Sequence, residues 1–349
     1  MPRMRVRFTS SQMGALLLIG VTPWLGVEYF CSAPRVGSAL RLTLPEGTTF
    51  AAIGGTLAGA GVIRSSAIFE WIARSRGARP DSAVKPGEYV FRPNENVRTV
   101  VNRLVTGDTL TYRVVVEPPA TIRSAAAAVA AQGLASEAEF TAAASRPPRS
   151  FRIPTEATRR TLEGYLPAGE YIFRKPVSPT AMVQAMVDVW FADVFAPRRS
   201  ELRNGRRSLD ELIIIASIVE AAADDPRDRP YVASVIENRL ERKVPLETPD
   251  VVLSLLRGRP MGDPRSREAL WLGMRHIGLP QAPVLTPNGT SLDAVLHPAS
   301  TEYLSFQKRG TRLWFSKKVQ RETLPLIREA EFKWERPAHS GRRVTAEPE

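Results

Sequence analysis

The stretch Ser208-Leu-Asp-Glu-Leu-Ile-Ile-Ile-Ala-Ser-Ile-Val-Glu220 decides how the C-terminal half of this chain folds. Ser208 and Glu211 stand three residues apart in front of an apolar run, which is the pattern of a capping box at a helix N-terminus. The run itself is apolar on nearly every side, and a helix of that kind is buried in a protein core. The sequence therefore predicts a buried helix over about 208–224, with an α+β domain built around it.

Glu220 is an ionisable residue at the end of this apolar run. Burial disfavours the charged form of a carboxyl group. A carboxylic acid that keeps its proton near neutral pH can serve as a general acid. The alternative is that Glu220 emerges into solvent where the helix ends. The pattern leaves both interpretations open and marks Glu220 as the candidate catalytic residue.

A second helix is expected over 229–242, because Val232, Val235 and Leu240 recur at helical spacing on one face. Loops rich in Gly, Pro and Asn follow it. Beyond them, aromatic-bearing segments at 303–306 and 312–316 are typical of a β-hairpin.

Upstream, two stretches of sequence occur twice. Residues 41–50 resemble residues 113–122 at an offset of 72, and Gly87-Glu-Tyr-Val-Phe-Arg92 shares five of six residues with Gly169-Glu-Tyr-Ile-Phe-Arg174 at an offset of 82. Matched pairs in the same order indicate a duplicated small module. Chance similarity among common β–α patterns is the alternative. In the first copy we expect a strand, two helices, a strand and a helix, at 41–45, 49–60, 66–75, 87–91 and 96–105.

The N-terminus has the features of a membrane anchor. Three arginines among the first seven residues precede an uncharged stretch, 8–27, which is about the minimum for a spanning helix of ~17–20 residues. Basic residues before such a helix keep the N-terminus in the cytoplasm. A cleaved signal peptide would need small residues before the cut, and a lipoprotein would need one before Cys31, where Phe30 stands. We therefore expect an uncleaved signal anchor at 11–30 behind a basic leader at 1–10.

Composition narrows the classes of function. The formal net charge of +12 would suit an anionic polymer, so a polyanion-binding protein is one alternative. No dense basic run with interleaved aromatics occurs, so nucleic-acid binding is not expected. One cysteine and three histidines exclude a Cys-rich zinc cluster and leave little for any metal site. We expect neither a metal nor a cofactor.

Several segments resemble, in the same order, the motifs of the endolytic murein transglycosylases, a family also called YceG-like or MltG. The signature of that family is similar to Ala216–Glu220 followed by Val232–Leu240, and its LEGY segment is similar to Leu162–Tyr165 with Tyr171 downstream. Further similar segments are Leu246–Thr248, Gly278–Pro280, Ser291–Pro298 and Tyr303–Leu304. The resemblance spans roughly residues 40–320.

The resemblance implies a single-pass inner-membrane protein whose small LysM-like modules and catalytic domain lie outside the cytoplasm. It implies cleavage of nascent peptidoglycan glycan strands between MurNAc and GlcNAc, leaving 1,6-anhydroMurNAc ends, without a metal or cofactor. Glu220 matches the catalytic glutamate of the family. Glycan strands, the inner membrane and cell-wall synthases are the partners it implies.

The matching segments also supply candidate substrate-binding residues, each of which could instead have a packing, turn or capping role: Glu163, Tyr171, Asn238, Glu247, Thr248 and Asn288. The domains we expect are the leader at 1–10, the anchor at 11–30, the duplicated LysM-like region at 41–150, the catalytic domain at 151–335 and a polar tail at 336–349. The tail has no periodicity and is expected to be disordered.

The chain departs from the family pattern at several positions. Ala221–Ala223 follow Glu220 where the family has polar residues that include a second glutamate. Trp271–Met274 stand in place of a YNTY segment, and Glu247 replaces a glutamine. These departures support an alternative function, in which the chain is a catalytically degenerate relative that binds peptidoglycan or acts as a scaffold.

Overall fold

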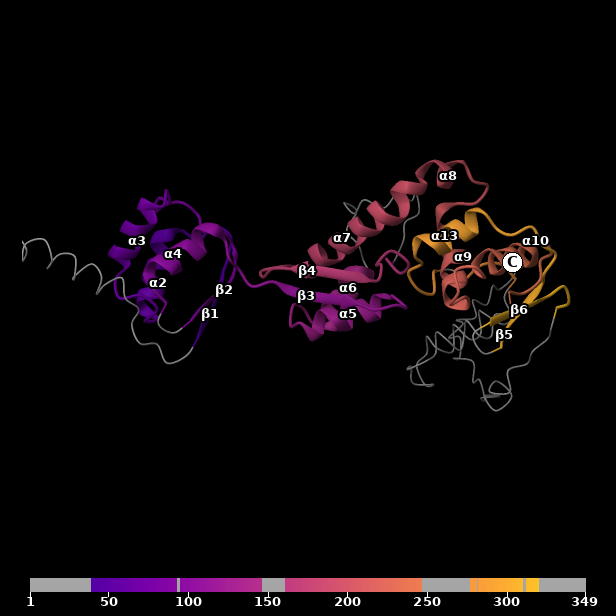
Figure 1. Cartoon of the computed structure of the whole chain (residues 1–349), viewed down its shortest axis with the longest axis horizontal. Helices are drawn as coiled ribbons and strands as arrows, with labels where there is room; N and C mark the ends of the chain where they lie inside the picture. Colours follow the sequence, from indigo (N-terminus) through magenta and orange to yellow (C-terminus); the bar gives the residue numbers. More distant parts are fainter. Residues whose placement is uncertain are drawn as a thin grey trace, which may run out of the picture. The chain divides into compact units, whose positions relative to one another are not determined.

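A computed structural model of the chain describes residues 39–92, 95–145, 161–246, 277–280, 282–309 and 312–319. The fold is mixed α+β and consists of two units (Figure 1). Among the described residues, the first unit contains 39–117, 123–145 and 168–186, and the second contains 118–122, 161–167 and the residues from 187 onward. We describe each unit by itself.

The first unit begins with a β-α-α-β-α module: β1 (Leu40–Leu44), α2 (Phe50–Gly59), α3 (Ser66–Ser75), β2 (Gly87–Phe91) and α4 (Val97–Thr106). Every boundary lies within one residue of the prediction. The helices begin where side chains of the preceding residues, Thr49, Ser65 and Asn96, accept backbone N–H groups of the first turn. The strands β1 and β2 pair antiparallel, and their inward side chains join a core that includes Leu57, Phe69 and Tyr89.

A second module of the same order follows: β3 (Tyr112–Val116), α5 (Ile122–Ala131), α6 (Glu137–Ser145), β4 (Gly169–Phe173) and α7 (Pro179–Trp190). Tyr112 pairs with Phe173 as Leu40 pairs with Phe91, so the two strand pairs share one register at the offsets that the sequence repeat shows. Because β4 pairs with β3, residues 168–186 fall in the first unit. The structure therefore divides the chain at a different place from the 150/151 boundary.

The second unit is built around α9 (Leu209–Ala222), as the capping box and apolar run predict. Ser208 and Glu211 make both hydrogen bonds of the capping box, and the helix is buried from Leu212 to Val219. It packs against α10 (Arg229–Glu241) and α13 (Gly289–Leu296). The other elements of this unit are a π-helical turn η1 (Phe191–Phe195), a 3₁₀ turn η2 (Ala196–Arg198), α8 (Arg199–Asn204) and the hairpin of β5 (Ser305–Arg309) and β6 (Arg312–Ser316).

Within the described part of the chain, no helix combines the length and the apolar character that crossing a membrane requires. The predicted anchor at 11–30 and the tail at 336–349 lie outside the described residues.

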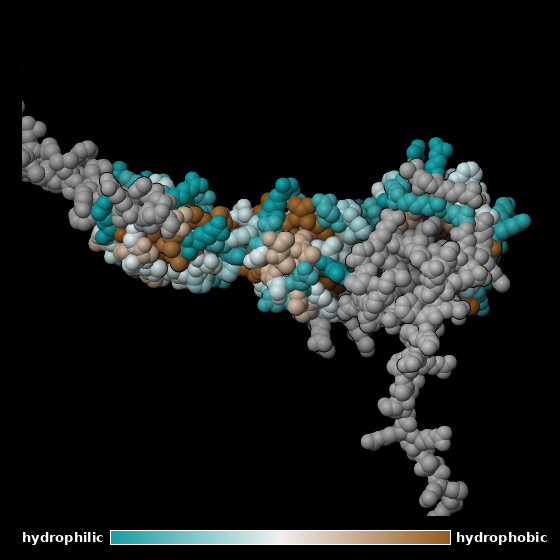
Figure 2. Space-filling view, turned by 90° about the horizontal axis from the view of Figure 1, so that it is seen from below, coloured by the Kyte–Doolittle hydropathy of each residue, from teal (hydrophilic) through white to brown (hydrophobic). Residues whose placement is uncertain are grey.

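On the face drawn in Figure 2, hydrophobic areas of the described surface alternate with hydrophilic and intermediate ones. Exposed apolar residues are scattered along the chain and include Trp71, Ile172 and Trp314. Single exposed apolar side chains are common in folded proteins, so each has to be judged by its surroundings.

Candidate functional site

Glu220 lies in the last turn of α9, and its side chain is 17% exposed. The helix ends two residues later, and the apolar faces that bury the preceding turns stop there. The carboxylate is therefore neither in an apolar core nor free in solvent. Polar neighbours from α10 and from the N-terminal end of α13 surround it.

Each of the contacts that the structure gives the Glu220 carboxylate comes from a hydrogen-bond donor. Arg229 Nη2 lies 3.2 Å from Oε1, and the Asn288 side-chain amide donates to the same oxygen at 3.1 Å. Oε2 accepts the Ser291 hydroxyl at 2.7 Å and the Asn288 backbone N–H at 3.2 Å. Together these donors determine the orientation of the carboxylate and leave its remaining surface accessible.

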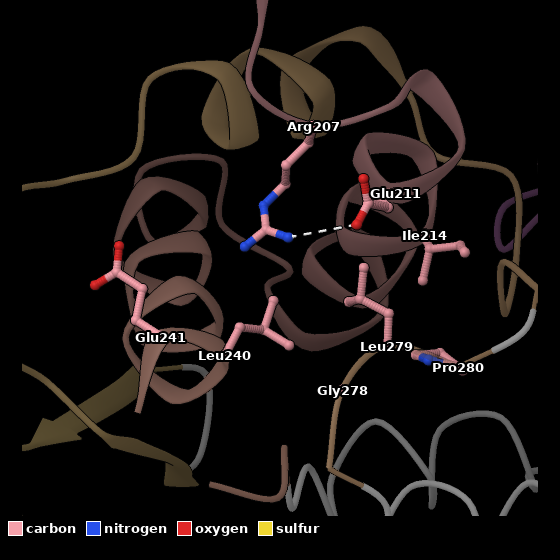
Figure 3. Close-up of a pocket in the computed structure, with 8 residues that line it drawn as sticks. All are labelled: Arg207, Glu211, Ile214, Leu240, Glu241, Gly278, Leu279 and Pro280. Atoms are coloured by element: carbon pink, nitrogen blue, oxygen red, sulfur yellow. Dashed lines mark ion pairs between the residues drawn. The ribbon is translucent and has the colours of Figure 1, made fainter. Parts of the chain in front are cut away.

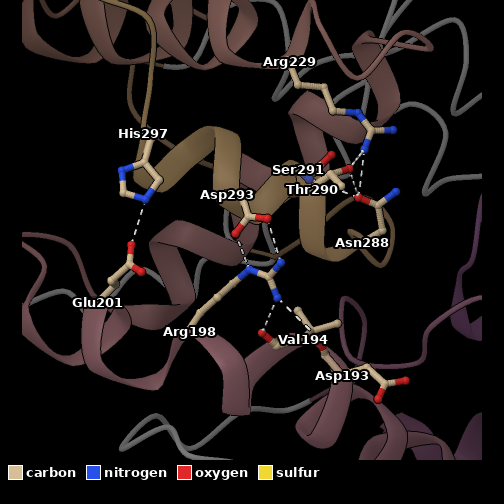
Figure 4. Close-up of polar contacts among 10 residues, drawn as sticks. All are labelled: Asp193, Val194, Arg198, Glu201, Arg229, Asn288, Thr290, Ser291, Asp293 and His297. Carbon is tan, nitrogen blue, oxygen red and sulfur yellow. Dashed lines mark hydrogen bonds and ion pairs between the residues drawn. The ribbon is translucent and has the colours of Figure 1, made fainter.

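Arg229 links the elements of this site. It is the first residue of α10, and its side chain is only 7% exposed. Beyond Glu220, its guanidinium donates to Asn288 Oδ1 at 2.8 Å and to the Thr290 hydroxyl (Figure 4). A buried guanidinium requires a paired charge and several acceptors, and Glu220 with its neighbours supplies them.

The N-terminus of α13 faces Glu220. Asn288 is the N-cap of this helix, because its side-chain oxygen accepts the backbone N–H of Ser291. The positive end of the helix dipole and its free N–H groups favour an anion at this point. Contacts away from Glu220 hold α13 in place: Arg198 makes two hydrogen bonds to Asp293, at 2.5 and 2.7 Å, and His297 pairs with Glu201 at 2.8 Å (Figure 4).

Acidic residues that follow Glu220 are paired elsewhere. Asp224 forms an ion pair with Lys308 at 2.5 Å, and Asp225 forms one with Arg227 at 2.7 Å. The hydrogen bonds from Arg227 hold the pKa of Asp225 at about 2. The carboxyl group of Asp225 is therefore not suited to exchange a proton beside Glu220 near neutral pH.

The structure brings Asn288, of the predicted substrate-binding residues, into contact with Glu220. Asn238 instead braces a loop, because its amide donates to the backbone carbonyls of Thr301 and Tyr303 at 2.8 and 2.9 Å. Glu163 accepts the backbone N–H of Ile122, the first residue of α5, at 3.2 Å. These are bracing and capping contacts, which was the alternative open for both residues.

Tyr171 lies in the first unit, on β4, where it is buried and its ring stacks on Phe173. It occupies the same place in the second module as Tyr89 does in the first. Glu247 and Thr248 lie outside the described residues.

Sequence reasoning missed Arg229, Thr290 and the role of Ser291 as a donor. One signal was present for Arg229. Only residues 223–228 connect the two predicted helices, so the first residue of the second helix must lie close to the end of the first, where Glu220 stands. No comparable local signal connects Ser291 with Glu220, because 71 residues separate them.

A cavity of about 400 Å³ lies elsewhere in this unit (Figure 3). Its lining residues come from the start of α9, the end of α10 and the 278–280 loop: Arg207, Glu211, Ile214, Leu240, Glu241, Gly278, Leu279 and Pro280. At about 1.5 Å of rise per residue, Glu211 and Glu220 are separated by roughly 13 Å along α9. The cavity is therefore distinct from the Glu220 site. Among the described residues, no cluster of His, Cys, Asp and Glu suits a metal ion.

Known proteins resemble this chain over most of its length. An endolytic murein transglycosylase of Bacillus subtilis is 26% identical over 288 residues, which are 77% of this chain and 78% of that protein. One from Streptococcus pneumoniae is 21% identical over 336 residues, 86% of this chain and 60% of that protein.

The crystal structure of a YceG-like protein from Listeria monocytogenes has the same fold, with a TM-score of 0.50 and 24% identity over 84% of this chain and 99% of that one. The model of the YceG-like family matches residues 42–323. Because that match spans both units and the segment around Glu220, the chain belongs to the YceG-like family.

Proposed function

We propose that this chain is an endolytic murein transglycosylase in which Glu220 is the catalytic acid and base. The observation that carries the proposal is the partly exposed Glu220 carboxylate, oriented by Arg229, Asn288 and Ser291. The relatives from Bacillus subtilis and Streptococcus pneumoniae bear that activity in their names. These names support the substrate class, and the contacts of Glu220 support the residue roles.

The chemistry needs only one carboxyl group from the protein. A glycosidase that uses water generally needs two, one as acid and one as base or nucleophile. In a lytic transglycosylase the C6 hydroxyl of MurNAc attacks its own C1, and an intramolecular attack gains much of its rate from proximity. Protonated Glu220 donates its proton to the leaving glycosidic oxygen. The resulting carboxylate then takes the proton of the C6 hydroxyl as the 1,6-anhydro ring closes.

The neighbours of Glu220 suit different halves of this cycle. Arg229 and the Asn288 amide can only donate to it, so they stabilise the carboxylate that forms when the proton leaves. The Ser291 hydroxyl can donate to a carboxylate and can rotate to accept from a carboxylic acid. Ser291 is thus the neighbour that can satisfy Glu220 in both protonation states.

The proposal extends to the rest of the chain. We assign to the two β-α-α-β-α modules a LysM-like role in holding glycan strands, and to residues 11–30 the role of an inner-membrane anchor with the N-terminus in the cytoplasm. Three arginines before an uncharged stretch support that orientation. The catalytic unit would then act on the outer side of the inner membrane, where nascent strands and cell-wall synthases meet.

Mass spectrometry of reaction products tests the function. The purified chain is incubated with un-crosslinked glycan strands, beside Glu220→Gln and the control Glu302→Gln. Glu302 is an exposed glutamate of the same unit that pairs with Lys317. We expect anhydro-ended fragments from the wild type and from Glu302→Gln and none from Glu220→Gln. If all three proteins bind the strands and none releases an anhydro product, the chain is a binding protein or scaffold that has lost its chemistry.

A further inference from the structure

The two modules of the first unit have such similar geometry that matched positions in them can be compared directly. Gly87 and Gly169, which open β2 and β4, have the same φ of +157°. Tyr89 stacks on Phe91 with ring centroids 6.2 Å apart, and Tyr171 stacks on Phe173 at 6.3 Å, each pair with an interplanar angle of 11°. Because β2 and β4 have the same local geometry, a difference in exposure between matched residues reflects the residues that pack around each strand.

In the first module, the chain itself covers the outer edge of β2. The backbone N–H of Leu110 donates to the carbonyl of Glu88 at 2.7 Å, and the Arg103 guanidinium donates to the carbonyl of Val90 at 2.6 Å. Thr109 packs so closely against Gly87 that a Cβ there would lie 2.2 Å from its methyl carbon. Under this cover Glu88 is only 7% exposed.

In the second module, no described residue covers the matched edge of β4 in this way. A Cβ on Gly169 would come no nearer than 3.9 Å to a neighbouring atom, and that atom belongs to Tyr171 of the same strand. Ile172 is 63% exposed, and the Glu170 side chain is 44% exposed beside Arg113. Among the described residues, none donates a hydrogen bond to the carbonyl of Glu170 or of Ile172.

The cover is missing because the chain continues differently after the last helix of the module. Gly107, with φ of +75°, ends α4 and turns the chain back along β2. At the offset of 82, its counterpart is Val189, which lies inside α7. The counterpart of Arg103 is Ala185, which has no side-chain donor. The returning segment and the Arg103 donor of the first module therefore have no counterpart at the matched positions of the second.

We propose that the outer edge of β4, formed by Gly169, Glu170 and Ile172, binds an extended segment of a partner polypeptide. Unpaired carbonyls on a strand edge are a ready site for strand addition, in which backbone hydrogen bonds supply affinity and alternate side chains supply specificity. The first module shows what fits this backbone: an N–H directed at the Glu170 carbonyl and a small side chain beside Gly169. Ile172 and Val115, which is 40% exposed, offer aliphatic contact on the adjoining face.

A polypeptide fits this edge better than the other occupants do. The N–H donors of a GlcNAc–MurNAc strand lie on acetamido side groups and not along its backbone, and the exposed side chains described at this edge are aliphatic and charged, with no aromatic platform for a sugar ring. A second copy of the chain that paired with this edge around Glu170 would bring two Glu170 side chains together at a two-fold axis, where like charges repel.

The probe that tests the proposal is a synthetic peptide with the sequence of residues 107–112, Gly-Asp-Thr-Leu-Thr-Tyr, which covers the equivalent edge in the first module. It is added to the full chain labelled with ¹³C at isoleucine methyl groups. We expect a saturable shift of the Ile172 methyl signal, while the buried Ile53 and Ile213 signals stay in place. The first module does not compete for the peptide, because its own segment already occupies that edge.

A peptide N-methylated at leucine is the matched control, because it lacks the N–H that would reach Glu170. Loss of one hydrogen bond should weaken its binding about three- to tenfold. The proposal is overturned if the Ile172 signal does not respond to the peptide, or if both peptides bind equally well. It is also overturned if soluble glycan fragments shift that signal and the peptide does not, or if the signal moves only with protein concentration, which would indicate self-association. No readout here depends on catalytic activity.

Discussion

At the scale of single residues, the site depends on how a charged side chain is held at the end of an apolar helix. Donors from α10 and α13 keep Glu220 in one orientation. The Arg229 guanidinium links these groups, because it donates to Glu220, to Asn288 and to Thr290. In the proposed mechanism Arg229 is a positioning residue, because it would act on the reaction through Glu220.

Replacing Arg229 with Met should therefore lower the turnover number more than it raises KM. A catalytic group displaced by about 1 Å can lose on the order of a hundredfold in rate, and we expect a loss of about ten- to a hundredfold. Arg229→Lys should recover little, since one ammonium cannot reach the same set of acceptors as a planar guanidinium. The rate of release of anhydro-ended products, measured against substrate concentration, gives both constants.

Arg198→Met is the matched control for this change. Arg198 also anchors α13, through Asp293, but it does not contact Glu220. Its loss should lower the thermal midpoint and leave the turnover number within about twofold of wild type. If the two variants lose the same activity, Arg229 only holds α13 in place.

At the scale of elements, the start of α9 depends on its capping box. Ser208→Ala removes the side-chain acceptor for the N–H of Glu211 and should cost about 1 kcal/mol of unfolding free energy. Urea denaturation measures the change. Ser200→Ala, at an exposed position within α8, should alter stability by less than about 0.5 kcal/mol. Equal effects at both positions would show that the box contributes nothing specific.

Tyr89 should make the stability of the first module depend on pH in the alkaline range. Burial, with a smaller contribution from Asp108, raises the pKa of Tyr89 from 10.0 to about 12. Above pH 10 the unfolded chain releases a proton that the folded chain keeps, so unfolding becomes more favourable. Stability should fall as the pH rises from about 10 to about 12, and Tyr89→Phe should show a smaller fall. Denaturant midpoints across this range, followed with both proteins, decide whether Tyr89 is responsible.

At the scale of the whole molecule, two physical effects could bring the chain to a membrane. A helix inserted in the bilayer would keep the chain at the membrane through the hydrophobic effect. A net charge of +12 would instead attract the chain to an anionic lipid surface. Salt screens the second effect and leaves the first.

We expect the full chain in cell membranes to resist extraction by 1 M salt (Debye length about 3 Å) and to be released by detergent. A chain that begins at Val36 should be released by salt or remain soluble. Immunoblots of the fractions provide the measurement. Release of the full chain by salt alone would favour electrostatic association over the anchor.

Local patterns in the sequence were enough to predict the first module to within one residue, the buried α9 and the repeat, because caps, periodicity and strand pairing signals act over a few residues. Asn288 was predicted as a substrate-binding residue only through the resemblance, and its place beside Glu220 comes from the structure. Neither local patterns nor the resemblance predicted the role of Arg229. In the structure Asn238 braces a loop and Glu163 accepts the first N–H of α5, and their predicted roles in substrate binding stay predictions. The contacts of Glu220 were decided by the packing of α10 and α13 against α9. This packing brings residues that are nine and 68 to 71 positions away in the sequence to one carboxylate. Local sequence patterns do not show which distant donor will pair with a given buried acceptor.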